Sequence, residues 1–155
     1  MTCAIKARLV DAVKDALKKG RKQEVGALRL ILAAIQQHEV DSRTEVDDAT
    51  TLTILGKLAK QRRESISQYE KAGRNDLVAQ ETFELDLLRS YLPEPLDDAD
   101  IDKAIGEAIA TAAAESPRDM GKVMGLLKAS LQGRADLGVV SARVKTRLSG
   151  GDDAA

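Results

Sequence analysis

Aromatic side chains are nearly absent from this sequence of 155 residues, which has no tryptophan, one phenylalanine and two tyrosines. Proteins that hold single-stranded nucleic acid by its bases stack those bases on aromatic rings, and this chain lacks such platforms. Hydrophobic residues still make up 43% of the chain, which is enough for a real core. Because alanine, leucine and charged residues dominate, we predict an all-α protein built of packed amphipathic helices.

Cysteine and histidine each occur once, as Cys3 and His38. An internal disulfide, a zinc site of cysteine and histidine ligands, and a histidine-based catalytic triad therefore all lack their parts. The sequence also shows no glycine-rich phosphate loop and no cluster of metal-binding carboxylates. We predict no catalytic residues, no bound metal and no cofactor.

Long hydrophobic runs are missing as well. No apolar stretch reaches about 18 residues, and the N-terminus has no signal-peptide core. The sequence thus predicts a soluble, cytoplasmic protein with no membrane partner. It leaves the oligomeric state open.

Apolar residues recur every three or four positions over residues 1–92, as expected for four helices of one N-terminal domain. The first helix stops at Gly20, and its apolar stripe consists of Ile5, Leu9, Val13 and Leu17. The other three helices are predicted over about residues 24–40, 48–72 and 77–92. Gly73 suits the left-handed position after the third helix, and Asn75 or Asp76 can cap the fourth.

Arg62 is the one charged residue that interrupts the apolar stripe of the long third helix. A guanidinium that is buried needs an acidic partner, because an unpaired buried charge is costly. Across the corner at Gly73, the nearest acids on the fourth helix are Glu81 and Glu84. We therefore predict that Arg62 pairs with one of them.

Pro93 and Pro95 cannot continue a helix and stiffen the chain that follows, so they mark a domain boundary. Residues 93–148 are predicted to form a small three-helix domain, and residues 149–155 a disordered tail. Ser116 followed by Pro117 is a strong start for the second helix of this domain, and Asp136 can cap the third.

Charge is segregated within the C-terminal part. Residues 93–117 carry seven acidic residues and one basic residue, whereas residues 118–147 carry seven basic and two acidic residues. Such segregation can steer a polyanion to one face of a protein. Charges near helix ends also segregate because they complement the helix dipole. The sequence leaves a binding face and a merely solvated face as alternatives.

Gly121 and Gly125 lie one turn apart in the second helix of the C-terminal domain. In an exposed helix each glycine costs about 1 kcal/mol relative to alanine, so a use for the bare backbone is expected. That use is a close approach, either to another helix or to a ligand. Helix packing is the interpretation that we favour from the sequence.

Three stretches of the chain together resemble the YqeY family of small bacterial proteins. They are Lys60-Gln61-Arg62-Arg63-Glu64-Ser65 up to Gly73-Arg74, Tyr91-Leu92-Pro93, and Asp119-Met120-Gly121-Lys122-Val123-Met124-Gly125 with Gly133-Arg134-Ala135-Asp136. YqeY proteins are similar to the C-terminal tail of the GatB subunit of the tRNA-dependent amidotransferase. The resemblance implies four helices followed by three, and an association with tRNA without catalysis. It also implies amidotransferase or tRNA synthetase components as possible protein partners.

The leading hypothesis is therefore a non-catalytic tRNA-binding module that recognises phosphate and shape. Its candidate contacts are the basic residues Lys57, Lys60, Arg63, Lys71 and Arg74 on the third helix, and Lys122, Lys128, Arg134, Arg143 and Lys145 in the C-terminal domain. One alternative is a protein-interaction adaptor in which Gly121, Gly125 and the apolar stripes accept a helix of a partner. The other is a carbon–nitrogen ligase that uses glutamine as amide donor, which rests on family association alone.

Overall fold

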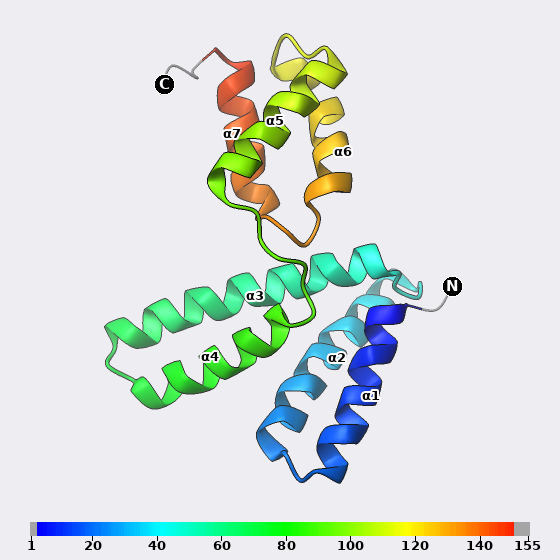
Figure 1. The fold of residues 1–155 in the computed structure, drawn as a ribbon, viewed down its shortest axis with the longest axis vertical. Coiled ribbons are helices and arrows are strands. Elements are labelled where there is room, and N and C mark those ends of the chain that lie inside the picture. The colour runs from blue at the N-terminus through cyan, green and yellow to red at the C-terminus, as the bar shows by residue number, and fades with distance from the viewer. Residues whose placement is uncertain (1–2, 151–155) are drawn as a thin grey trace. The chain divides into compact units, whose positions relative to one another are not determined.

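The computed structural model describes residues 3–150, and every regular element in this range is a helix (Figure 1). The all-α prediction is confirmed. Residues 151–155 of the predicted tail lie outside the described residues, whereas the N–H of Ser149 still bonds to the carbonyl of Lys145 at 3.0 Å. The helices are α1 (Ala4–Lys18), α2 (Lys22–Ser42), α3 (Asp48–Lys71), α4 (Asn75–Arg89), α5 (Asp98–Ala112), the short 3₁₀ helix η1 (Pro117–Asp119), α6 (Met120–Leu131) and α7 (Leu137–Leu148).

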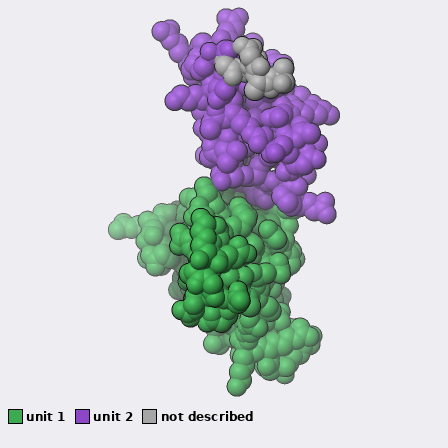
Figure 2. All heavy atoms as spheres, turned by 90° about the vertical axis from the view of Figure 1, so that its left-hand side faces the viewer, with its two compact units in different colours: residues 1–93 green, residues 94–155 purple. Residues whose placement is uncertain are grey.

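The chain divides into two compact units, Met1–Pro93 and Glu94–Ala155, which Figure 2 shows in separate colours. We call them unit 1 and unit 2. Buried aliphatic side chains form one cluster in unit 1 and a second in unit 2, and no residue belongs to both clusters. Each unit therefore has a hydrophobic core of its own, as expected of a domain.

Unit 1 consists of two helical hairpins, α1 with α2 and α3 with α4 (Figure 1). Gly20 and Gly73 follow the first helix of each hairpin, and both have a φ of +68°, which only glycine adopts readily. After each glycine the next N–H reaches back across the helix end, from Arg21 to Ala16 and from Arg74 to Tyr69, at 2.9 Å in both cases. This is the Schellman arrangement, and it confirms the role predicted for Gly73.

The first turn of α4 differs from the sequence-based expectation. Arg74 occupies the N-cap position without a side-chain cap, and Asn75 and Asp76 are already helical. The carboxylate of Asp76 instead accepts hydrogen bonds from the Arg74 guanidinium at 3.0 and 3.2 Å. The Schellman turn at Gly73 uses Arg74 as its last residue, so the helix begins directly after it and leaves no room for a separate cap.

The buried stripe of α1 also differs from the prediction at its end. Leu17 is 52% exposed, whereas Ala16 is 1% exposed and packs in the core with Leu9. A helix turns by about 100° per residue, so a step of seven returns almost to the same face, while a step of eight from Leu9 to Leu17 is off by roughly 80°. An alanine therefore replaces the expected leucine where α1 meets its neighbours.

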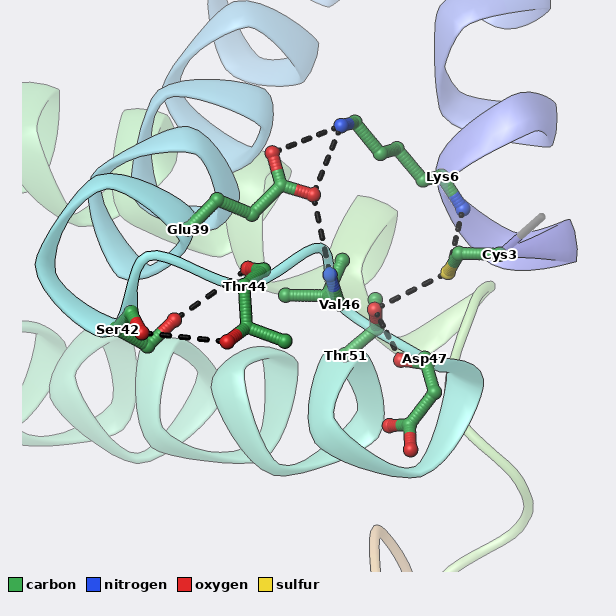
Figure 3. A network of polar contacts seen from close by, with 8 residues as sticks. All are labelled: Cys3, Lys6, Glu39, Ser42, Thr44, Val46, Asp47 and Thr51. Carbon is green, nitrogen blue, oxygen red and sulfur yellow. Dashed lines mark hydrogen bonds and ion pairs between the residues drawn. The ribbon is translucent and has the colours of Figure 1, made fainter. Parts of the chain in front are cut away.

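Four chain segments of unit 1 meet in a polar network at the start of α1 (Figure 3). The carboxylate of Glu39, near the end of α2, accepts two hydrogen bonds of 2.9 Å from the Lys6 ammonium and one of 3.1 Å from the N–H of Val46. The sulfur of Cys3 lies 3.2 Å from the hydroxyl of Thr51 on α3. Because these contacts join the start of α1 to α2, the α2–α3 loop and α3, they fasten the two hairpins together.

This network makes the stability of unit 1 decrease at low pH. The ammonium of Lys6, followed by the N–H of Val46, lowers the pKa of Glu39, and the N–H of Ile5, followed by Cys3, lowers the pKa of Asp48. A carboxylate with a lowered pKa contributes its stability fully above its ordinary pKa and loses it as the pH falls through the lowered value. We expect the urea midpoint of unit 1 to fall between about pH 5 and pH 2, and to fall less in Glu39→Gln.

The matched control for this experiment is Glu64→Gln, since Glu64 is exposed on α3 outside the network. It should keep the pH dependence of the unsubstituted protein. An identical pH profile for Glu39→Gln and the unsubstituted protein would contradict the role given to Glu39.

Unit 2 is a three-helix arrangement of α5, α6 and α7 around an aliphatic core. The side chains of Ile105, Val123, Leu127, Val140 and Val144 are at most 1% exposed. The helix starts are capped by acids: Asp97 accepts from the N–H of Asp100 at 2.7 Å and Asp136 from that of Gly138 at 2.9 Å, the latter as predicted. Ser116 and Pro117 do begin a helix, although its first turn is the 3₁₀ helix η1.

Candidate nucleic-acid interface

The exposed side of α6 presents two lysines on either side of two glycines. At about 100° per residue, Gly121 and Gly125 fall between Lys122 and Lys128 around the helix axis, while Val123 and Leu127 point the opposite way. The burial agrees, because Val123 and Leu127 are buried and the other four are exposed. Leu126 on the same side is 42% exposed. We call Gly121, Lys122, Gly125, Leu126 and Lys128 the α6 face.

The two glycines of the α6 face do not pack against another helix of this chain. A Cβ atom added at Gly121 or Gly125 would meet no atom within 4 Å. The favoured prediction of close helix packing therefore fails within the described residues. The open backbone leaves the second use, a close approach by a ligand or a partner, as a prediction.

This geometry gives a stability prediction. Replacing Gly121 and Gly125 by alanine removes the entropy cost of glycine without a clash, so we expect unit 2 to gain about 1–2 kcal/mol in free energy of unfolding. Urea unfolding followed by circular dichroism measures the gain. The same change at Gly133 is the matched control and should destabilise unit 2, because its φ of +77° strains any residue with a Cβ. A double alanine variant that is less stable than the unsubstituted protein would contradict the open backbone.

Lys122 and Lys128 are the lysines of α6, and neither forms an ion pair within residues 3–150. Asp119 lies one turn before Lys122, but its carboxylate accepts hydrogen bonds from the N–H groups of Glu115 at 3.0 Å and Ser116 at 3.4 Å. These backbone bonds, the one from Glu115 above all, lower the pKa of Asp119, and Lys122 adds a smaller electrostatic contribution. Both ammonium groups are thus available to an anion from solvent.

Arg143 on α7 is held differently. Its guanidinium lies 2.7 Å from Asp98 and 3.3 Å from Asp102, both in the acidic start of α5, and Asp98 above all raises the pKa of Arg143. Arg147 adds a hydrogen bond of 3.1 Å to the carbonyl of Asp102. The alternative that basic residues balance the acids within the same unit therefore applies to these two arginines.

Arg134 follows α6 and contacts the first residues of unit 2. Its Nε donates to the carbonyl of Glu94 at 3.3 Å, and its own carbonyl accepts from the N–H of Leu96 at 3.0 Å. The side chain and backbone of Arg134 thus fasten the turn after α6 to the segment around the two prolines. Lys145, the remaining candidate of unit 2, is exposed in the last turn of α7.

The candidates on α3 belong to unit 1. Lys60 and Arg63 are exposed, as are Lys57 and Lys71, and Lys60 has an interaction within the chain. Arg74 pairs with Asp76 at 3.0 Å, an ion pair that raises the pKa of Arg74. Acidic residues such as Glu64 and Glu70 alternate with these cations along α3. Lys57, Arg63 and Lys71 have no ion pair within the described residues either, so the α6 face is distinguished by the open glycine backbone between its lysines rather than by more charge.

Arg62 lies where its sequence context predicts. Its NH1 atom is 3.3 Å from Glu81 and its Nε is 2.9 Å from Glu84, so it pairs with both acids, and all three side chains are mostly buried. The Nε is buried without a well-directed hydrogen bond, so the contact with Glu84 is an ion pair and little more. The predicted pairing is confirmed, and the one guanidinium forms ion pairs with both carboxylates.

A groove between α2 and α4 was not foreseen from the sequence. It has a volume of about 610 Å³, and Gly26 and Leu30 on α2 and Ala79 and Glu84 on α4 are among its lining residues. A second hollow of about 490 Å³ lies beside the network of Figure 3, at Lys6, Val10 and Glu39. Within residues 3–150 there is no group of three or more histidine, cysteine or acidic side chains placed to hold a metal ion. No helix in that range is long and apolar enough to span a membrane.

Comparison with known proteins relates almost the whole chain to one family. The sequence model of the family described as Yqey-like protein matches residues 6–148. Among curated relatives, the protein called altered inheritance of mitochondria protein 41, mitochondrial, is 29% identical in Pyrenophora tritici-repentis over 130 residues, which are 83% of this chain and 71% of the relative.

The proteins of the same name in two other organisms are similar over shorter parts. In Saccharomyces cerevisiae strain YJM789 the identity is 31% over 118 residues, which cover 72% of this chain and 60% of the relative. In Eremothecium gossypii it is 38% over 87 residues, which cover 56% of this chain and 48% of the relative. The matched region thus spans between about half and three quarters of these relatives.

Proposed function

This chain belongs to the YqeY family, and we propose that it is a non-catalytic accessory protein that binds tRNA through the α6 face. The observation that carries the proposal is the pair Lys122 and Lys128, which form no ion pair within the described residues and flank the bare backbone of Gly121 and Gly125. A sugar–phosphate backbone can approach a helix closely where two glycines leave no side chain in the way. The lysines then supply the charge that phosphate binding requires.

Sequence-independent binding fits the residue types of the α6 face. Lysine acts as a point charge on phosphate, and base recognition in single-stranded RNA relies on aromatic stacking that this chain with three aromatic residues lacks. The proposal is therefore recognition of backbone and shape. The resemblance of the family to the GatB tail makes tRNA the RNA to test first, and amidotransferase or tRNA synthetase components the protein partners to test first.

The test is filter binding of the full chain to total tRNA at two salt concentrations. Binding should weaken steeply with salt, and the double variant Lys122→Gln, Lys128→Gln should lower the slope of log K against log salt by about 2. Arg134 is best left unchanged, because its contacts with Glu94 and Leu96 make a loss of fold hard to separate from a loss of binding.

Arg143→Gln is the matched control, because it removes the same charge from a guanidinium that already has Asp98 and Asp102 as partners. It should change the stability of unit 2 and leave the salt slope nearly as it is. A double lysine variant that keeps both the affinity and the slope would rule out the α6 face, and absence of binding at low salt would rule out the RNA function.

The ligase alternative has no support from the one cysteine of the chain. Cys3 is 6% exposed, and its sulfur contacts Asp48 at 3.1 Å and Thr51 at 3.2 Å as part of the network that joins α1 to α3. Such a thiol serves packing and capping rather than nucleophilic attack. The relatives are named as mitochondrial proteins, while a cytoplasmic location for this chain stays a prediction.

A further inference from the structure

We propose that the groove between α2 and α4 of unit 1 binds a helical segment of a partner protein through one lysine or arginine flanked by apolar residues. The residues that line the groove span about two turns of each helix, from Lys22 to Leu30 on α2 and from Asp76 to Glu84 on α4. This inference rests on unit 1 alone. It therefore stands or falls separately from the RNA function proposed for unit 2.

The charged residues of the groove favour a basic partner, because Asp76 and Glu84 are acidic and only Lys22 among the lining residues is basic. Glu81 and Glu84 share the single guanidinium of Arg62, so this mostly buried cluster carries one excess negative charge. Glu84 lines the groove, its side chain is 11% exposed, and it accepts no hydrogen bond from the described residues. A carboxylate in this state gains from a cationic donor, because charged hydrogen bonds in a partly desolvated site are about twice as strong as neutral ones.

The other lining residues fit the stem of a basic side chain and its apolar neighbours. Gly26, Ala27 and Ala79 are small, so an approaching helix can come close to both walls. Leu30, at 52% exposed, offers apolar surface to a side chain that enters the groove. A lysine can lay its methylene groups on the exposed Ala79 while its ammonium reaches Glu84. An amphipathic helix with such an anchor is the helix-in-groove mode of recognition.

A basic helix suits this groove better than nucleic acid does, because the acidic residues Asp76 and Glu84 outnumber the one basic lining residue, Lys22. The two units thus offer opposite chemistry: available lysines on the α6 face, and in the groove a carboxylate that shares its one cation with Glu81. An accessory protein with both could hold RNA with one unit and a protein with the other.

The experiment is selection of a phage library of random 16-residue peptides on the full chain. Enriched peptides should carry one lysine or arginine with apolar residues three or four positions away. The strongest peptide, made synthetically, should lose about tenfold in affinity when its basic residue is changed to glutamine, and also on Glu84→Gln in the protein. Absence of enrichment, or enrichment of peptides without a basic residue, overturns the proposal.

A second variant keeps the test valid if Glu84→Gln disturbs the fold. Gly26→Leu fills the groove, and a Cβ at Gly26 meets nothing within 4 Å, so the helix keeps its structure and gains in propensity. It should weaken the peptide at least tenfold. Gly56→Leu is the matched control, since Gly56 is also open but is outside the groove, and it should leave binding unchanged. Equal binding to the Gly26→Leu protein would place the peptide elsewhere and overturn the proposal.

Discussion

Replacement of Leu127 by alanine is expected to unfold unit 2 under conditions in which unit 1 stays folded. Leu127 is 1% exposed in the core of α5, α6 and α7. A buried leucine-to-alanine change costs about 2–5 kcal/mol, because it removes transfer free energy and leaves a cavity. A unit of this size has roughly 3–8 kcal/mol of stability in all, so the loss is comparable to the whole.

Limited proteolysis and hydrogen exchange, read separately over residues 3–93 and 94–150, check this result. Protection of α5, α6 and α7 should collapse in Leu127→Ala, while that of α1 to α4 should stay near its original level, since the two cores share no residue. Leu126→Ala is the matched control, because Leu126 is 42% exposed and its loss should cost less than about 1 kcal/mol. Equal effects of the two changes would contradict the assigned core.

Replacement of Arg62 by methionine should cost unit 1 about 3 kcal/mol or more in free energy of unfolding. The change keeps the apolar stem but leaves Glu81 and Glu84 without their cation, and their side chains are only 15% and 11% exposed. Removal of one partner from a buried ion pair is costly because the remaining charge is left uncompensated in a poorly solvated place. Urea unfolding of the variant measures the loss.

The control for Arg62→Met is the triple variant that also carries Glu81→Gln and Glu84→Gln. With no charge left in the cluster, most of the lost stability should return, since replacing a whole buried ion cluster by neutral groups is often close to neutral. A single variant as stable as the unsubstituted protein, or a triple variant as unstable as the single one, would show that the cluster does not act electrostatically.

The sequence by itself determined the features that depend on near neighbours in the chain. Helix ends were predictable because Gly20, Gly73 and Asp136 act within one turn, through a positive φ or a carboxylate that reaches a nearby N–H. The partner of Arg62 was predictable because a helical hairpin with a tight corner brings α3 and α4 into a register that follows from chain length.

Only the tertiary structure decided which available charges and open surfaces remain once the helices have packed. Arg143 and Lys128 look alike in the sequence, yet one meets Asp98 and Asp102 from a helix 41 to 45 residues away and the other faces solvent. The sequence favoured helix packing for Gly121 and Gly125, whereas a Cβ at either position would meet no atom within 4 Å, and it gave no sign of the groove between α2 and α4. Periodicity gives the face of a helix that is apolar, whereas the rotation and spacing of helices distant in the chain come from the packing of whole side chains.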